Sequence, residues 1–137
     1  MNRIMAIDYG ERRIGIALTD PLKIFSKPYL VLENKGKKLF LEELEEIIKE
    51  QNVSEVILGY PLGESGQITK KTAEIEKLHK FLSNNLSVEI ILHDERFSTI
   101  DANEELKKLG YNYMDAKKVI DMVAASMILK SYLKMIG

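Results

Sequence analysis

Three acidic positions in this chain have the residue type and placement to act on a phosphate group. Asp8 ends an apolar run, Asp94 and Glu95 end another, and Asp121 interrupts the apolar stretch 119–129. A carboxylate among aliphatic side chains must be protonated, paired or bound to a cation, because burying it ionised and alone is very costly. If these carboxylates meet, divalent cations would relieve their repulsion, and two such ions about 4 Å apart support phosphodiester hydrolysis.

The segments around these residues predict an α/β protein with a mixed five-stranded sheet and helices on both faces. The first three strands should form an antiparallel meander, with Pro21 and Pro28 bracketing the loop before the third. Later strands alternate with helices and should therefore run parallel to the first. The expected strands are 3–10, 12–20, 29–34, 53–61 and 88–95, and the expected helices are 36–51, 68–82, 98–110 and 114–136.

The expected topology brings the acidic positions together. Ligands of such sheets collect at the carboxyl ends of the parallel strands, which is where Asp8 and the pair Asp94 and Glu95 lie. Adjacent residues of a strand point to opposite faces, so only one of that pair can easily face Asp8. A long last helix packed across the sheet would bring Asp121 to the same edge. Oxygen ligands of this kind favour Mg²⁺ or Mn²⁺.

Four sequence blocks resemble one known family in order and approximate spacing. The resemblance is to the YqgF family of proposed pre-16S ribosomal RNA nucleases, which are also described as Holliday-junction-resolvase-like. It implies a ribonuclease-H-like fold, a two-metal nuclease mechanism and a role in 5′-end maturation of small-subunit rRNA. It also selects Asp8, Glu95 and Asp121 as catalytic, metal-binding residues. The blocks are IMAIDYGERRIGIALTD, ILGYPLGESGQ, HDERFST and VIDMVAASMIL.

Further residues near the acidic positions suit contact with a phosphodiester backbone. Arginines can neutralise phosphates, hydroxyls and a helix N-terminus can bind them, and glycines permit close backbone approach. Each has a structural alternative: the glycines could form an ordinary turn, Asp8 could be a turn residue, and Asp121 could be satisfied by a lysine or a backbone amide. The substrate-binding candidates are Arg12, Arg13, Gly59, Gly66, Arg96, Ser98 and Thr99.

Composition narrows the class of protein. A chain of 137 residues, 30% charged and 45% apolar, suits one domain, which we expect to span 1–137. It lacks cysteine, and no apolar run approaches the ~20 residues of a membrane span, so we expect a cytoplasmic protein without membrane contact. A formal net charge of -1 argues against indiscriminate nucleic-acid binding but allows a local basic face.

The expected partners are structured RNA (pre-rRNA) or branched DNA, with ribosomal particles as a further candidate, and the expected state is a monomer or weak homodimer. Three other functions remain open from the sequence. A Holliday-junction resolvase would use the same chemistry, normally as a symmetric dimer. A non-catalytic RNA-binding ribosome-assembly factor would retain the residues without the reaction. A sugar-kinase-like or actin-like phosphotransferase shares the fold core but usually needs two such domains to enclose ATP.

Overall fold

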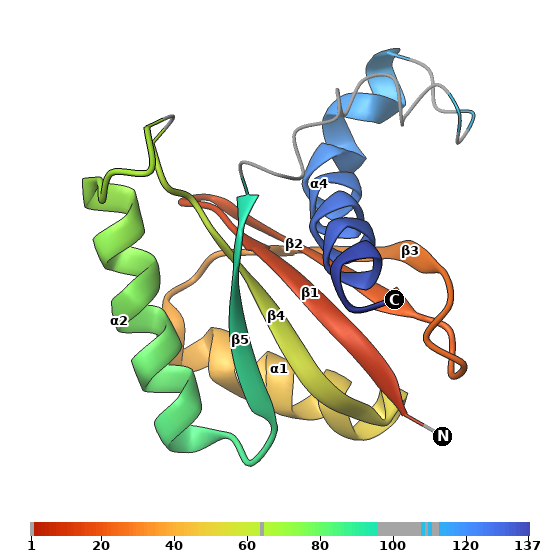
Figure 1. Ribbon diagram of the computed structural model, residues 1–137, viewed down its shortest axis with the longest axis horizontal. Coiled ribbons are helices and arrows are strands. Elements are labelled where there is room, and N and C mark those ends of the chain that lie inside the picture. The colour runs from red at the N-terminus through yellow and green to blue at the C-terminus, as the bar shows by residue number, and fades with distance from the viewer. Residues whose placement is uncertain (1, 64, 96–107, 109, 111–112) are drawn as a thin grey trace.

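A five-stranded sheet with helices on both faces forms the body of the protein (Figure 1). The computed structural model describes residues 2–63, 65–95, 108, 110 and 113–137. The strand order is β3-β2-β1-β4-β5. The elements are β1 (Arg3–Tyr9), β2 (Arg13–Thr19), β3 (Ser26–Glu33), α1 (Lys37–Gln51), β4 (Val53–Tyr60), α2 (Lys70–Asn85), β5 (Glu89–Asp94) and α4 (Tyr113–Ile136).

The pairing directions confirm the predicted topology. Strands β1, β2 and β3 form the antiparallel meander, whereas β4 runs parallel to β1 and β5 parallel to β4. Ile7 of β1 pairs with Leu58 of β4, and Gly59 of β4 pairs with His93 of β5. The carboxyl ends of the three parallel strands, at Tyr9, Tyr60 and Asp94, therefore lie side by side.

Alternation along β1 sends its side chains into two separate cores, one on each face of the sheet. Met5 and Ile7 pack in the core that contains the buried residues of α1 and α2. Ile4 and Ala6 pack against α4, which crosses the sheet in front in the view of Figure 1. Asp8 follows Ile4 and Ala6 in this alternation, so its side chain points toward α4.

Small residues line the face under α4 and let this helix lie close to the sheet. Ala6, Ala17 and Ala125 are fully buried between the strands and the helix. At Gly15 of β2, a Cβ atom would overlap the backbone carbonyl of Asp121. Only glycine fits there, and its close approach fixes the position of Asp121 over β2.

The expected loop between Pro21 and Pro28 and the expected start of the third strand at residue 29 are wrong. Strand β3 begins at Ser26, and Pro28 lies within it, opposite Ala17. Proline cannot donate a ladder hydrogen bond, which generally excludes it from central strands. In this sheet β3 is an edge strand, and its register with β2 shifts between Ile16 and Ala17, so proline is tolerated.

Helix α2 begins later than its apolar spacing suggests. Thr69 and Thr72 form a capping box, in which each side chain accepts a hydrogen bond from the other's backbone N–H. The Thr72 hydroxyl also donates to the carbonyl of Pro61, 2.6 Å away, and so ties the helix start to the loop after β4. Ile68, expected on the buried side of the helix, precedes the cap and is exposed.

The helix expected over 98–110 falls almost entirely outside the described residues. The last helix, expected over 114–136, is confirmed as α4. Within the described ranges, none of the helices has the length and apolar character needed to cross a lipid bilayer.

Candidate active site

Glu95, rather than Asp94, continues the side of β5 that faces α4. Ile91 packs with the α4 core, and His93 Nε2 lies 3.0 Å from the Ser131 hydroxyl of α4. The alternate residues of β5 pack with the core of α1 and α2. Alternation therefore places Asp94 on the far side and Glu95, directly after the strand, on the same side as Asp8.

Asp8 and Glu95 meet at the carboxyl edge of the sheet, where their side chains share a hydrogen bond. Two carboxylates can bond to each other only if one of them carries a proton. Burial raises the pKa of both groups, and the pKa of Glu95 reaches about 7. The charge of Asp8 raises the pKa of Glu95 further, and Lys71 of α2 opposes the shift in both groups.

Gly59 provides the space for the Glu95 carboxylate. A Cβ atom at this position would overlap Glu95 Oε1 and lie 2.9 Å from Cδ1 of Ile128 on α4. The sequence suggested Gly59 for close approach to a phosphate. In the structure its missing side chain instead leaves room for a neighbouring acid.

Asp121 reaches the same edge from α4. Its charge raises the pKa of Asp8, so the two carboxylates are close enough to interact. Its Oδ2 atom accepts a hydrogen bond from Arg13 Nε at 2.8 Å, and the Asp121 side chain is 22% exposed. The apolar helix thus tolerates an aspartate because Arg13 of β2 pairs with it. The sequence predicted a metal ligand at this position, with a lysine or a backbone amide as the structural alternative.

The remaining predicted site residues divide into three groups. Arg12 is exposed beside Arg13. Gly66 lies in the loop after β4 with a φ of 82°, a left-handed conformation that favours glycine, and its N–H donates to the carbonyl of Gly63. Arg96, Ser98 and Thr99 lie outside the described residues.

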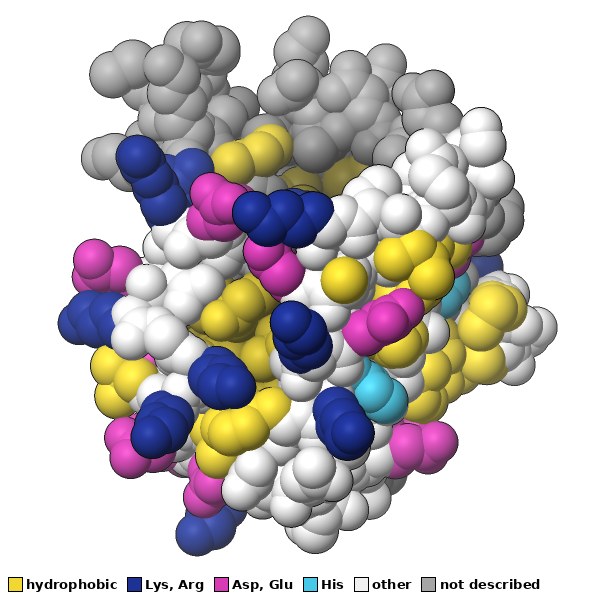
Figure 2. All heavy atoms as spheres, turned by 90° about the vertical axis from the view of Figure 1, so that its left-hand side faces the viewer, with side chains coloured by type: hydrophobic (Ala, Val, Ile, Leu, Met, Phe, Trp, Pro, Cys, Tyr) yellow, Lys and Arg dark blue, Asp and Glu magenta, His cyan; other side chains and the backbone are white. Residues whose placement is uncertain are grey.

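Lys71 belongs to the site, although adjacent lysines such as Lys70 and Lys71 on a helix are usually just part of a solvated face. It is the cation whose charge acts on both Asp8 and Glu95. Its position follows from the capping box, which starts α2 at the loop after β4. Lys77 and Lys80 on the same helix are also exposed. Figure 2 shows Lys and Arg side chains spread over this side of the molecule with acidic side chains between them.

The chemistry of Asp8 and Glu95 suits one divalent cation, which would take the place of the proton between them. Among residues 2–63, 65–95, 108, 110 and 113–137, no three His, Asp or Glu side chains form a ready metal-binding group. Asp8 and Glu95 supply two carboxylates, and Mg²⁺ commonly takes one or two together with water and phosphate. Asp121 is bound to Arg13 through Oδ2, and this contact competes with its joining them.

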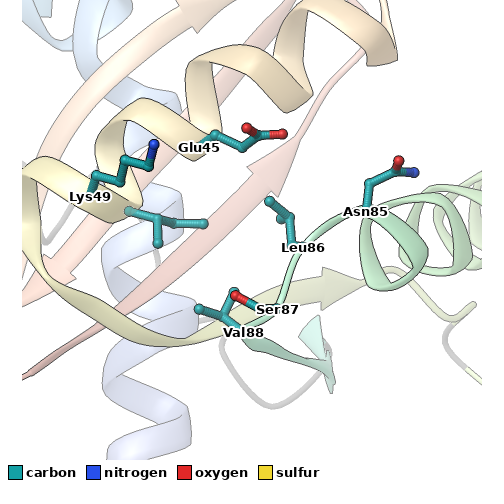
Figure 3. A pocket seen from close by; sticks show the side chains of 7 residues that line it. Glu45, Lys49, Asn85, Leu86, Ser87 and Val88 are labelled. Carbon is teal, nitrogen blue, oxygen red and sulfur yellow. The ribbon is translucent and has the colours of Figure 1, made fainter.

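The hollow between α1 and the segment that joins α2 to β5 lies at the opposite edge of the sheet (Figure 3). It sits before the start of β5, whereas Glu95 follows the end of that strand. Its charged lining residues are Glu45 and Lys49 of α1. The hollow therefore lies at the other end of β5 from Asp8 and Glu95 and is not part of the acidic site.

Lys71→Gln is expected to raise the pKa of Glu95 above about 7, because it removes the cation that favours the ionised form. A carboxyl group whose pKa is higher in the folded than in the unfolded protein stabilises the fold at low pH, and this contribution is lost as the pH rises through the folded-state pKa. In EDTA, the Tm of the wild type should therefore fall as the pH rises from about 4.5 to about 7. The fall should extend to higher pH in the variant.

Lys70→Gln is the matched control, because it removes the same charge one residue away and Lys70 does not shift the pKa of either acid. Thermal melts from pH 4 to 9 would show the difference. Identical pH profiles for the two variants would mean that Lys71 does not act on the acidic pair.

Comparison with known proteins gives concordant results. The family described as "RuvX: Holliday junction resolvase" matches residues 2–135. A protein of Caldicellulosiruptor bescii, named as a proposed pre-16S rRNA nuclease, is 40% identical over 133 residues, which are 96% of this chain and 95% of that protein. A protein of Maridesulfovibrio salexigens with the same name is 36% identical over 131 residues, which are 96% of this chain and 97% of that protein.

Solved structures share the fold at low sequence identity. RuvC of T. thermophilus in complex with a Holliday junction substrate superposes with a TM-score of 0.62 at 10% identity, covering 98% of this chain and 96% of RuvC. The Fowlpox virus resolvase in complex with Holliday junction DNA gives 0.60 at 14% identity, covering 98% of both chains. These likenesses confirm the ribonuclease-H-like fold.

Proposed function

Because this chain belongs to the RuvX family of Holliday junction resolvases, we propose that Asp8, Glu95 and Asp121 form the active site of a divalent-cation-dependent nuclease. The protein is a hydrolase that acts on nucleic-acid phosphodiester bonds. The observation that supports this site is the hydrogen-bonded pair of Asp8 and Glu95, with pKa values raised by burial, at the carboxyl edge of the parallel strands.

The acidic pair is chemically suited to a cation. Two partly buried carboxylates that share a proton at low pH repel each other once both are ionised, and a divalent ion in place of that proton removes the repulsion. Asp8 and Glu95 would hold Mg²⁺ or Mn²⁺, and Asp121 would complete the set. When bound, such ions activate the attacking water and stabilise the leaving oxygen.

The residues around the acids would bind and orient the substrate. The ammonium of Lys71 offsets negative charge at Asp8 and Glu95 and lies where a scissile phosphate would add more. Arg13 begins β2 and its guanidinium binds Asp121, while Arg12 precedes it and is exposed. Together with Arg96, Ser98 and Thr99, they would contact the phosphates that the acids repel.

The substrate that we propose is a precursor of small-subunit rRNA. The relatives of 40% and 36% identity are named for pre-16S rRNA, and they match almost all of this chain. A four-way DNA junction is the second candidate, because the family description names Holliday junction resolution. The protein would act in the cytoplasm as a monomer or weak homodimer, with or without a ribosomal particle as partner.

The test is a side-by-side cleavage assay of two substrates with Mg²⁺ or Mn²⁺. One is a precursor small-subunit rRNA fragment with its 5′ flank, and the other is a four-way DNA junction. We expect wild type to cut the RNA, EDTA to stop cutting, and Asp121→Asn to lower the rate by roughly 10²-fold or more. Preferred cutting of the junction would reverse the substrate assignment. Failure of folded wild type to cut either would favour a non-catalytic assembly factor.

A further inference from the structure

Asp121 has two competing partners at the carboxyl edge of the sheet. Its Oδ2 atom is bonded to Arg13 Nε at 2.8 Å, while its charge acts on Asp8. The backbone of Asp121 is fixed by contact with Gly15, so only its side chain can choose between the two directions. A carboxylate bonded to a guanidinium is a poorer ligand for a cation, because the guanidinium engages one of its oxygens and offsets its negative charge.

Arg13 is placed so that it can release Asp121. Its side chain is 57% exposed, and an ion pair this exposed contributes little net free energy, because solvent screens it. The bond uses Nε, one of the five N–H donors of a guanidinium. The two free oxygens of a backbone phosphate are a strong bidentate partner for the same group.

We infer that Arg13 is a positioning residue that holds Asp121 away from the cation site in the free protein and exchanges it for a substrate phosphate. This inference rests on the proposed function. Nucleic-acid binding would release Asp121 toward Asp8 and Glu95, and the third carboxylate would then strengthen cation binding. Substrate and cation would therefore bind with positive coupling, each raising the affinity for the other by the same factor. The site would be complete only when a nucleic-acid backbone is present.

The exchange makes a prediction that does not depend on cleavage. Without nucleic acid, Arg13→Gln is expected to bind Mn²⁺ roughly twofold to fivefold more tightly than wild type. This factor corresponds to the net free energy of an exposed ion pair, which wild type must give up and the variant need not. If Arg13 merely supported Asp121, its removal would instead weaken Mn²⁺ binding, because the Asp121 carboxylate would lose its fixed orientation. Mn²⁺ affinity can be measured by electron paramagnetic resonance of the free ion. In the cleavage assay the variant should show a raised KM for the RNA.

Two further variants separate the exchange from general electrostatics. Arg12→Gln removes the same charge from the neighbouring exposed residue and should change Mn²⁺ affinity less than twofold. In Arg13→Gln combined with Asp121→Asn, the gain in Mn²⁺ affinity should vanish relative to Asp121→Asn alone, because the gain requires the released carboxylate.

The outcomes distinguish this inference from the proposed function. If wild type shows cation-dependent cleavage but Arg13→Gln binds Mn²⁺ no more tightly than Arg12→Gln, the exchange is wrong and the nuclease assignment stands. If wild type binds Mn²⁺ but cuts neither substrate, the proposed function fails even where the exchange holds. Absence of Mn²⁺ binding by wild type and Arg13→Gln alike would overturn both.

Discussion

Asp8→Asn is expected to abolish divalent-cation-dependent cleavage, with a rate loss of roughly 10²–10³-fold or more. Asparagine has nearly the shape of aspartate but lacks the charge that holds a cation beside Glu95. Because Asp8 lies within β1, the central strand of the sheet, the backbone should be unaffected by so conservative a change. Single-turnover cleavage at saturating Mn²⁺ would measure the loss, and circular dichroism would verify the fold.

The same variant should be more stable than wild type when no metal is present. At pH 8 in EDTA the buried acids are ionised and repel each other, and Asp8→Asn removes one of the two charges. We expect a rise in Tm of roughly 2–6 °C. Asp94→Asn is the matched control, since alternation turns this carboxylate to the other face, and it should retain cleavage. Asp8→Asn that cuts as fast as wild type would remove Asp8 from the mechanism.

Gly15→Ala is expected to cause the largest loss of stability that a single methyl group can produce in this protein. The added Cβ atom would overlap the carbonyl of Asp121 and press on the backbone N of Met122, and neither atom can move without moving α4. Overpacking of this kind costs roughly 3 kcal/mol, or a fall in Tm of roughly 10 °C for a chain of this size. Cleavage should also fail, because Asp121 is carried away from the acidic pair. Thermal melts and cleavage below the Tm would measure both effects.

Gly59→Ala provides the comparison. Its Cβ would meet the ends of two side chains, Glu95 and Ile128, rather than a backbone. Side-chain ends can turn aside, so the loss of stability should be nearer 1 kcal/mol. Activity should nevertheless fall, because Glu95 is the group displaced. Equal Tm values for Gly15→Ala and wild type would show that α4 does not depend on close contact at Gly15.

Much of this arrangement could be predicted from local sequence patterns. Apolar runs and helical stripes give the strands and helices, and the alternation of later strands with helices gives their parallel direction. The position of Asp8 and Glu95 at one edge follows from that topology alone. The edge position of β3, which admits Pro28, could not be seen locally because it depends on which strand lacks a neighbour.

The partners of the acids were harder to predict because they come from distant elements. Arg13 and Asp121 are 108 residues apart in the chain and meet only because Gly15 lets α4 approach β2. Lys71 reaches Asp8 and Glu95 because a capping box fixes the first turn of α2, and lysines on a helix otherwise indicate only a solvated face. Sequence spacing identifies which groups could do chemistry, whereas packing decides which groups meet.

The acidic residues of the proposed site are synthesised at different times. Asp8 lies on β1, which is made before the other described elements, and Asp121 lies on α4, which is made after them. Until α4 docks, one face of the sheet lacks its covering helix and the third carboxylate is missing. Domains fold as units during synthesis, so this one cannot finish folding early. A partly translated chain would therefore be harmless to RNA, and a newly made nuclease would become active only after its last helix is released.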